Sequence, residues 1–382
     1  MKFFQVLPAF RKTTQSLRHT ACISLDHNLT SRYTKTLVTM YYPSKANGEA
    51  SGERAPWLPS YAHAGNWSSF VKLPYHLLGG FSSLFFRGAT LRSPTRLPPE
   101  LVEVEGDSSQ LPLIILSHGL ASWGNHYSSL CSYLASFGYI VITLDHTDGS
   151  ATVASLEDGP KQFEVVDESK ANIENFKRRR GEQLEQRIRD VSDVWNFVKH
   201  YKKGDSDDSI VDEVLSKTGK EEFIVAGHSF GGGTAYACLE SPLFEGDSCR
   251  AGLLFDPWLD AFKWSSSFKD WKNNQKEKII LTCDKGFISS TDKWRVQLEP
   301  ISEMDSTVKV RYLGMDHIDV CDVPLMLPIS TQPDSWFIEN MWECKEFLKR
   351  IGMHVNEDVA KDLDEKRADV GKRCNKSYKA PF

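Results

Sequence analysis

The pentapeptide Gly227-His228-Ser229-Phe230-Gly231 has the residue types and the spacing that nucleophilic catalysis by a serine requires. A serine hydroxyl is a weak nucleophile at neutral pH, so it needs a base, an acid that orients the base, and donors for the oxyanion. Glycines two residues before and after the serine allow a sharp turn from a strand into a helix, which exposes the hydroxyl. An apolar run precedes this turn and helix-forming residues follow it, which favours a nucleophile over a serine in a chance glycine-rich loop. We therefore predict that Ser229 is the nucleophile.

The base is expected near the C-terminal end of the catalytic region, because many such enzymes carry their residues in the order Ser, acid, His. His317, in Gly314-Met315-Asp316-His317, has this position, and the alternative for it is an ordinary surface histidine. His354 lies later, in a charged region beyond the last predicted helix. His228 is adjacent to Ser229, and neighbouring side chains at a sharp turn point apart. We therefore predict His317 as the base.

Two aspartates between Ser229 and His317 are candidates for the acid, because each ends an apolar run. Asp256 ends LLFD, and Asp284 ends LTCD. Analogy with other serine hydrolases favours the later one, whereas the requirement to reach the imidazole suits both. The residue types alone leave this choice open.

An oxyanion hole requires two backbone amides that point at the developing charge. The residue after the nucleophile supplies one, which predicts Phe230 as a donor. The other is expected from the loop after an earlier strand, where Ser117-His118-Gly119-Leu120 lies. His118 is interpreted as a brace of this loop, because no partner ligands stand at metal-binding spacing around it.

Short apolar runs alternate with helical patterns along the chain, which indicates a mostly parallel sheet covered by helices on both faces. Neither GxGxxG after a strand nor GxxxxGK[ST] is present, so nucleotide-binding folds of this architecture are not favoured. With Ser229 between strand and helix, we expect an α/β-hydrolase fold. The predicted strands are 36–42, 111–117, 140–146, 222–229, 251–256, 278–284 and 308–314, and the predicted helices are 126–139, 184–198, 231–240 and 335–351.

Composition limits the remaining possibilities. The net charge of −5 over 382 residues does not suggest a nucleic-acid partner, and the basic run 177–180 is interpreted as a solvated helix face. The eight cysteines contain no CxxC pair or zinc spacing, so no metal is expected and an intracellular compartment is favoured. We expect an N-terminal extension at 1–20, a catalytic domain at 21–355 and a loosely attached charged tail at 356–382. A cytoplasmic location is favoured over a mitochondrial or secreted one.

Five motifs occur in one order: SHGL at 117–120, LDHTDGSA at 144–151, GHSFGGGTA at 227–235, LLFDPW at 253–258 and GMDHIDVCD at 314–322. Together they resemble the platelet-activating factor acetylhydrolases, over the chain from about Cys22 through the closing helix. The resemblance implies a calcium-independent serine esterase without a cofactor, acting on the sn-2 ester of phospholipids with short or oxidised acyl chains. It also implies Asp256 rather than Asp284 as the acid, and the amides of Leu120 and Phe230 as the oxyanion donors.

The apolar segment Phe70–Phe86 falls where this family has a surface that docks on lipid, so we expect peripheral membrane contact there; the alternative is a buried helix and loop. Two rival functions stay open. One is a general carboxylesterase, lipase or thioesterase. The other is a binding protein that has kept the fold without activity, which the complete Ser, Asp and His set disfavours.

Overall fold

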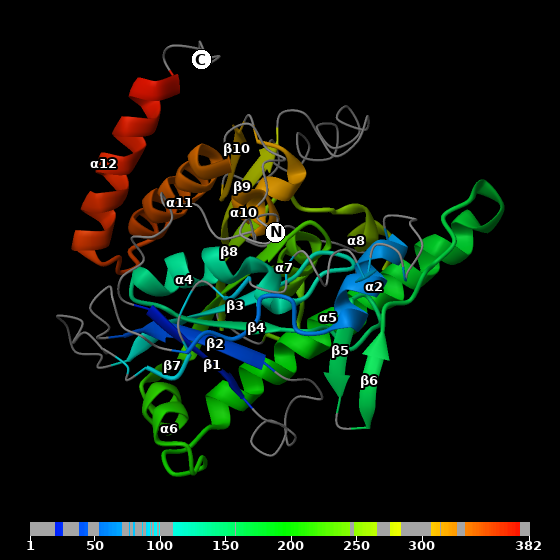
Figure 1. Ribbon diagram of the computed structural model, residues 1–382, viewed down its shortest axis with the longest axis horizontal. Coiled ribbons are helices and arrows are strands. Elements are labelled where there is room, and N and C mark those ends of the chain that lie inside the picture. Colours follow the sequence, from blue (N-terminus) through cyan, green and yellow to red (C-terminus); the bar gives the residue numbers. More distant parts are fainter. Residues whose placement is uncertain are drawn as a thin grey trace, which may run out of the picture.

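A sheet of eight strands forms the centre of the molecule (Figure 1). The computed structural model describes residues 20–25, 38–44, 53–70, 110–156, 158–244, 248–265, 276–283, 307–313, 315–326 and 333–374, with single residues or short stretches between 76 and 99. The strand order is β1-β2-β4-β3-β7-β8-β9-β10. Only β2 runs against its neighbours among these strands. The strands are β1 Thr20–Leu25, β2 Val38–Pro43, β3 Leu111–Ser117, β4 Ile140–Leu144, β7 Thr218–His228, β8 Cys249–Phe255, β9 Glu277–Cys283 and β10 Val308–Leu313.

Helices bury both faces of the sheet. In β3, Ile114 and Leu116 pack into one apolar cluster, and Leu113 and Ile115 pack into the other. This alternation follows from the two-residue period of a strand, and burial on both sides explains why the strands are continuous apolar runs. The first cluster contains α4 Ser128–Ser136, α11 Pro333–Arg350 and α12 Glu357–Cys374; the second contains α5 Ile173–His200, α6 Ser209–Ser216, α7 Phe230–Glu240 and α8 Asp260–Trp264. The predicted mostly parallel sheet with helices on both faces is confirmed.

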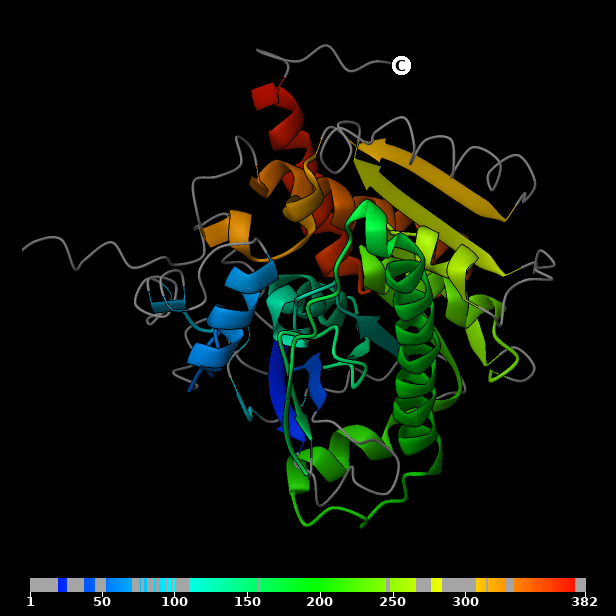
Figure 2. The ribbon, with the colours of Figure 1, turned by 90° about the vertical axis from the view of Figure 1, so that its right-hand side faces the viewer.

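The long helix α5 runs along one side of the molecule (Figure 2). Its predicted apolar stripe is buried as expected. The basic run at its start is less uniform than predicted. Lys177 and Arg178 pair with acids on the same helix and are partly exposed, whereas Arg180 is buried beside the ring of Phe176. The prediction of a solvated face is therefore wrong for Arg180, because its position on the helix turns it toward the protein.

Three segments are more ordered than their polar composition suggested. The polar stretch 149–175 contains an antiparallel hairpin of β5 Val153–Leu156 and β6 Gly159–Gln162. The end of the Gly-, Pro- and Ser-containing stretch 46–66 belongs to α2 Tyr61–Phe70, where Asn66 donates to the carbonyl of Thr152. The linker before β7 contains α6, capped by the carboxylate of Asp208. The hairpin pairs residues that are close in sequence, and the bond from Asn66 connects α2 to the start of this hairpin across 86 positions.

The residues expected to form a charged tail instead form α12, which packs on α11. Ala360 and Leu363 are buried in the same cluster as α4, and Arg367 lies over the ring of Trp342 while it pairs with Glu339. A narrow apolar stripe and charge pairing thus attach the described part of this segment. The remaining short elements are η3 Gly124–Tyr127, η4 Lys170–Asn172, η6 His317–Val320 and α10 Val323–Met326. None of the helices in the described ranges is long and apolar enough to cross a bilayer.

Candidate active site

Ser229 lies at the turn between β7 and α7, where the sequence pattern predicted it. Its backbone has φ 57° and ψ −119°, a conformation that a residue with a side chain adopts only under strain. The flanking glycines permit this turn. A Cβ at Gly227 would come within 2.0 Å of the Gly231 carbonyl oxygen, and one at Gly231 within 2.0 Å of the Ser117 carbonyl oxygen. Strain of this kind, held in place by close backbone packing, is a common property of functional sites.

The structure brings Asp256 and His317 into direct contact through Asp256 Oδ2 and His317 Nδ1. Asp256 follows β8 at a positive φ of 38°, and its amide donates to the carbonyl of Leu281 at 2.6 Å. Its second carboxylate oxygen accepts from Thr282 Oγ1 at 2.7 Å. The carboxylate is therefore oriented from two sides. Asp284, the other candidate for the acid, lies outside the described residues.

The same turn that holds Ser229 also places Asp256 near it. The Ser229 amide donates to the carbonyl of Phe255 at 3.0 Å, and the Trp258 amide donates to the carbonyl of Ser229 at 2.7 Å. The ends of β7 and β8 are thus joined on both sides of Asp256. Since parallel neighbouring strands end at one edge of the sheet, the predicted nucleophile and the predicted acid meet there.

Both predicted oxyanion donors lie beside Ser229. Phe230 is the first residue of α7, and the first four amides of a helix have no acceptor within the helix. A Cβ placed on Gly119 would lie 3.4 Å from Ser229 Cβ, so the backbone that leads into Leu120 passes directly against the serine. Phe230 therefore begins α7 directly after the serine, and Gly119, which precedes Leu120, contacts the serine from the loop after β3.

Tyr127 and His228, which were not predicted to belong to the site, connect the loop after β3, the serine turn and the His317 loop. Tyr127 Oη accepts from the Gly119 amide at 3.1 Å and lies 2.9 Å from His228 Nδ1. His228 Nε2 lies 2.8 Å from the His317 carbonyl oxygen, which can only accept, so Nε2 carries the proton and Tyr127 donates to Nδ1. Burial lowers the pKa of His228 well below its usual range, and the neighbouring His317 lowers it further. His228 is thus a neutral link between the serine turn and the His317 loop.

The His317 loop is also held by a buried carboxylate. Asp322 accepts from Trp57 Nε1 at 3.0 Å and from the amides of Ser128 and Ser129 at 3.0 and 2.9 Å. The start of α4, whose first amides have no acceptor within the helix, thus binds a negative group at the favourable end of the helix dipole. This contact joins the His317 loop to α4, on the face of the sheet that α4, α11 and α12 cover. The sequence motif ending at Asp322 contained the residue, but its partners lie 193 to 265 positions away.

His118 has the loop-bracing contacts that the sequence analysis expected. It is fully buried; its Nε2 accepts from the His146 amide at 3.1 Å, and its Nδ1 lies 2.7 Å from the Gly119 carbonyl oxygen. Within the residues that the structure describes, no group of three or more His, Cys, Asp or Glu side chains could hold a metal ion.

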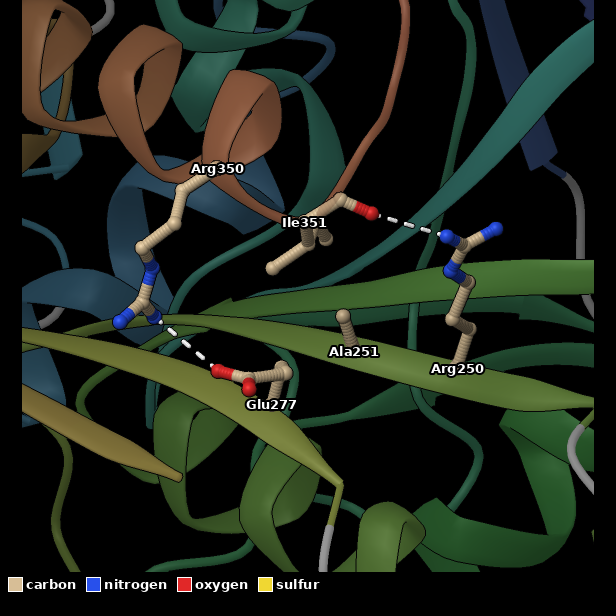
Figure 3. Close-up of a pocket in the computed structure, with 5 residues that line it drawn as sticks. All are labelled: Arg250, Ala251, Glu277, Arg350 and Ile351. Atoms are coloured by element: carbon tan, nitrogen blue, oxygen red, sulfur yellow. Dashed lines mark hydrogen bonds and ion pairs between the residues drawn. The ribbon is translucent and has the colours of Figure 1, made fainter. Parts of the chain in front are cut away.

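One pocket formed by described residues lies away from Ser229 (Figure 3). It has a volume of about 310 Å³ and is lined by Arg250, Ala251, Glu277, Arg350 and Ile351. Arg350 pairs with Glu277, and Arg250 donates to the Ile351 carbonyl, so both guanidinium groups are engaged within the wall. These residues stand near the starts of β8 and β9, whereas Ser229 and Asp256 follow the ends of β7 and β8. The pocket is therefore separate from the candidate active site.

The fold and the site together define an α/β-hydrolase: a mostly parallel sheet, a strained serine between strand and helix, and an Asp–His pair after later strands. A family model described as platelet-activating factor acetylhydrolase, isoform II, matches residues 19–325. This chain belongs to that family.

Relatives with the same name are similar over most of the matched region. The platelet-activating factor acetylhydrolase of Canis lupus familiaris is 27% identical over 251 residues, covering 62% of this chain and 53% of that protein. The corresponding protein of Bos taurus is 28% identical over 251 residues, with the same coverage. The chain thus matches about half the length of these relatives. A solved structure of a ferulic acid esterase from Streptomyces cinnamoneus superposes with a TM-score of 0.51 at 18% identity, over 92% of this chain and 87% of that one; this likeness concerns the fold.

Proposed function

We propose that this chain is a serine esterase that hydrolyses the sn-2 ester of phospholipids with a short or oxidised acyl chain. The observation that carries the proposal is the contact between Asp256 and His317 at the same edge of the sheet as the strained Ser229. Membership in the platelet-activating factor acetylhydrolase family supports the choice of substrate. No metal or organic cofactor takes part in the proposed chemistry.

The proposed mechanism uses the hydrogen bonds of the site. Asp256 accepts from His317 Nδ1, which leaves the other ring nitrogen, Nε2, unprotonated and able to take the Ser229 proton. Ser229 then attacks the ester carbonyl, and the amides of Leu120 and Phe230 stabilise the oxyanion. The protonated His317 returns its proton to the leaving lysophospholipid alkoxide. Water, deprotonated by His317, attacks the acyl-enzyme; the bond to Ser229 breaks and releases the fatty acid, and His317 returns the proton to the Ser229 oxygen.

The substrate class is tested with purified protein and a series of phospholipids that differ only in the sn-2 acyl chain. We expect kcat/KM to be highest for acetyl and short or oxidised chains, and at least about tenfold lower for a sixteen-carbon chain, since one methylene changes binding in a pocket by 10-fold or more. A long-chain triglyceride and an acyl thioester serve as comparison substrates. A preference for either of these over short-chain phospholipids would contradict the substrate assignment and favour a general lipase or thioesterase.

We further propose a cytoplasmic protein that contacts membranes peripherally through Phe70–Phe86. Few residues of this segment belong to the described part of the chain. Phe70 ends α2 with its ring 6.1 Å from that of Phe163, and Phe86 is buried at 4.9 Å from the ring of Trp57. The two ends of the segment are therefore anchored, and the apolar residues between them, Leu77 and Leu78 among them, are the proposed contact.

This contact is tested by flotation with phosphatidylcholine vesicles. We expect Leu77→Ser with Leu78→Ser to lower the vesicle-bound fraction by about tenfold, because each buried leucine side chain contributes roughly 1.5–3 kcal/mol of transfer free energy. Leu243→Ser is the matched control, since Leu243 is an exposed leucine in the loop after α7. Equal binding of the double variant and the wild type would contradict the membrane contact and leave the hydrolytic proposal unaffected.

A further inference from the structure

The motif LDHTDGSA, at 144–151, takes no part in the chemistry described above, yet it lies beside the oxyanion loop. The Ala121 amide donates to the carbonyl of Ser150 at 2.8 Å, and Ser122 pairs with Ala151 in an isolated bridge. Ala121 has a positive φ of 53°, which is unfavourable for alanine. The turn 148–151 therefore holds the loop after β3 in a conformation that the loop would not adopt by itself.

A single buried side chain joins this turn to the oxyanion loop. Arg187 of α5 has no exposed surface. Its Nε and Nη2 donate to Ser150 Oγ at 2.8 and 2.7 Å, and its Nε lies 3.3 Å from a carboxylate oxygen of Asp148. Its Nη1 donates to the His118 carbonyl at 2.6 Å, and its Nη2 lies 3.4 Å from the Gly119 carbonyl oxygen. The guanidinium thus bonds to the turn 148–151 on one hand and to the backbone of the oxyanion loop on the other.

The Gly119 carbonyl belongs to the same peptide unit as the Leu120 amide. A peptide unit is planar, so donors that hold its carbonyl also fix the direction of its N–H. Arg187 approaches this carbonyl from α5, and His118 Nδ1 lies 2.7 Å from the same oxygen. His118 Nε2 accepts a hydrogen bond from the His146 amide, so in the neutral ring Nδ1 carries the proton and donates to the Gly119 carbonyl. The Leu120 amide, one of the two proposed oxyanion donors, is therefore oriented by buried groups that donate to the carbonyl of its own peptide unit.

The residue that supplies the other proposed donor, Phe230, contacts the same guanidinium through its ring. The carbon at the centre of the Arg187 guanidinium stands 4.3 Å from the centroid of the Phe230 ring, a cation–π geometry. Phe230 is fully buried, so its ring fixes the start of α7 against Arg187. A planar group with five donors can bond to two carbonyls and stack on a ring at once, which a lysine ammonium cannot do.

We propose that Arg187 is a positioning residue that sets the oxyanion hole, holding the Leu120 amide through the Gly119 carbonyl and the Phe230 amide through its ring. This proposal rests on the proposed serine-esterase function. It assigns a role to the LDHTDGSA motif: Asp148 supplies the countercharge for the buried cation, and Ser150 fixes its orientation. It does not depend on the identity of the acyl chain.

The chain provides a matched control for Arg187. Arg180 is a second buried arginine of α5, seven residues earlier and so on the same face of the helix. Its Nη1 donates to Gln183 at 2.6 Å, and its guanidinium lies 5.2 Å from the Phe176 ring. It therefore shares the burial and the ring contact of Arg187 but is bonded to its own helix.

The test compares Arg187→Gln, Arg187→Lys and Arg180→Gln with p-nitrophenyl acetate and with a short-chain phospholipid. Rates are divided by the fraction of protein that a fluorophosphonate labels, so that misfolded protein does not count. We expect Arg187→Gln to lower kcat by on the order of 10²-fold with KM changed less than threefold, because a misplaced oxyanion donor acts in the transition state. Arg187→Lys should lie between this variant and the wild type, and Arg180→Gln should stay within threefold of the wild type.

Two inhibitors separate positioning from general damage. A trifluoromethyl ketone analogue forms a tetrahedral adduct with a negative oxygen, whereas an sn-2 ether analogue binds without one. We expect Arg187→Gln to weaken the ketone by the same factor as kcat/KM and to leave the ether analogue unchanged. Equal weakening of both inhibitors, or an equal loss in Arg180→Gln, would overturn the proposal.

A second variant covers the case in which Arg187→Gln does not fold. Phe230→Leu keeps the backbone amide but removes the ring under the guanidinium, and we expect the same difference between the two inhibitors in this variant. If the wild type hydrolyses neither ester and is not labelled, the serine-esterase function itself is wrong and the role of Arg187 is wrong with it. If the wild type is active and the Arg187 variants keep full kcat, only the positioning role is refuted.

Discussion

Ser229→Ala is expected to lower esterase kcat by about 10⁴-fold or more, because loss of the nucleophile in a triad removes nearly all of its rate enhancement. The fold should be retained, because the substitution removes only the Ser229 hydroxyl, and backbone hydrogen bonds with Phe255 and Trp258 hold the turn. The measurement is hydrolysis of a short-chain phospholipid, together with fluorophosphonate labelling and mass spectrometry of the labelled peptide. Retained turnover, or a label on a residue other than Ser229, would contradict the proposed mechanism.

Three companion variants sharpen this prediction. Asp256→Asn should lower kcat by about 10⁴-fold, because an amide no longer holds the imidazole in the required tautomer. Asp284→Asn is its control and should keep wild-type activity; the reverse result would transfer the acid to Asp284. Ser229→Gly should abolish activity and raise the free energy of unfolding by about 1 kcal/mol, because glycine adopts a φ of 57° without strain.

The second large effect is a loss of stability in acid, caused by buried neutral histidines. For each of these histidines, burial is the largest cause of a lowered pKa. Burial lowers the pKa of His63 to about 4 and that of His126 to about 3. The group also includes His118, His146 and His228. The unfolded chain binds protons at these side chains below about pH 6.5, whereas the folded protein does not. The stability present above pH 6.5 is therefore lost as the pH falls, by about 1.4 kcal/mol per pH unit for each histidine.

Buried carboxyls, Asp145 and Asp322 among them, oppose part of this loss. Burial raises the pKa of Asp145 to about 7 and that of Asp322 to about 6. The folded protein therefore takes up their protons before the unfolded chain does, and gains stability from them as the pH falls toward 4. The contribution of these carboxyls cancels when the wild type is compared with a variant that lacks one histidine, because both proteins contain them.

His126→Phe provides this comparison. His126 is stacked on Trp123 with 4.4 Å between ring centroids, and its Nε2 is buried without a hydrogen-bond partner among the described residues. Protonation would thus bury an N–H without an acceptor, while phenylalanine keeps the stack. We expect the wild type to lose about 2 kcal/mol relative to the variant between pH 7.5 and pH 5.0, as measured by urea unfolding. Parallel dependence of the two proteins on pH would contradict the assignment of His126 as a buried neutral side chain.

The sequence by itself determined the elements whose signals are local. Apolar runs bounded by turn residues located most of the sheet strands that the structure describes, because a strand buried on both faces cannot tolerate polar residues. The glycines around Ser229 marked the strained turn, since no other residue type fits within 2.0 Å of a neighbouring carbonyl. The relative order of Ser229 and His317 singled out the histidine that lies against Asp256.

Only the tertiary structure decided which distant residues meet. The residue types left Asp256 and Asp284 as equal candidates, and the family resemblance favoured Asp256. Its bond from Thr282 exists because β8 and β9 end side by side, and its contact with His317 joins residues 61 positions apart. Arg187 is one of many charged residues in the sequence of α5, and its place beside the oxyanion loop depends on how α5 packs against β3. The segment of α12 looked too charged to pack, but ion pairs with α11 add to its narrow apolar stripe. Such partners are separated by tens of residues, and no local pattern encodes which of them the packed sheet brings together.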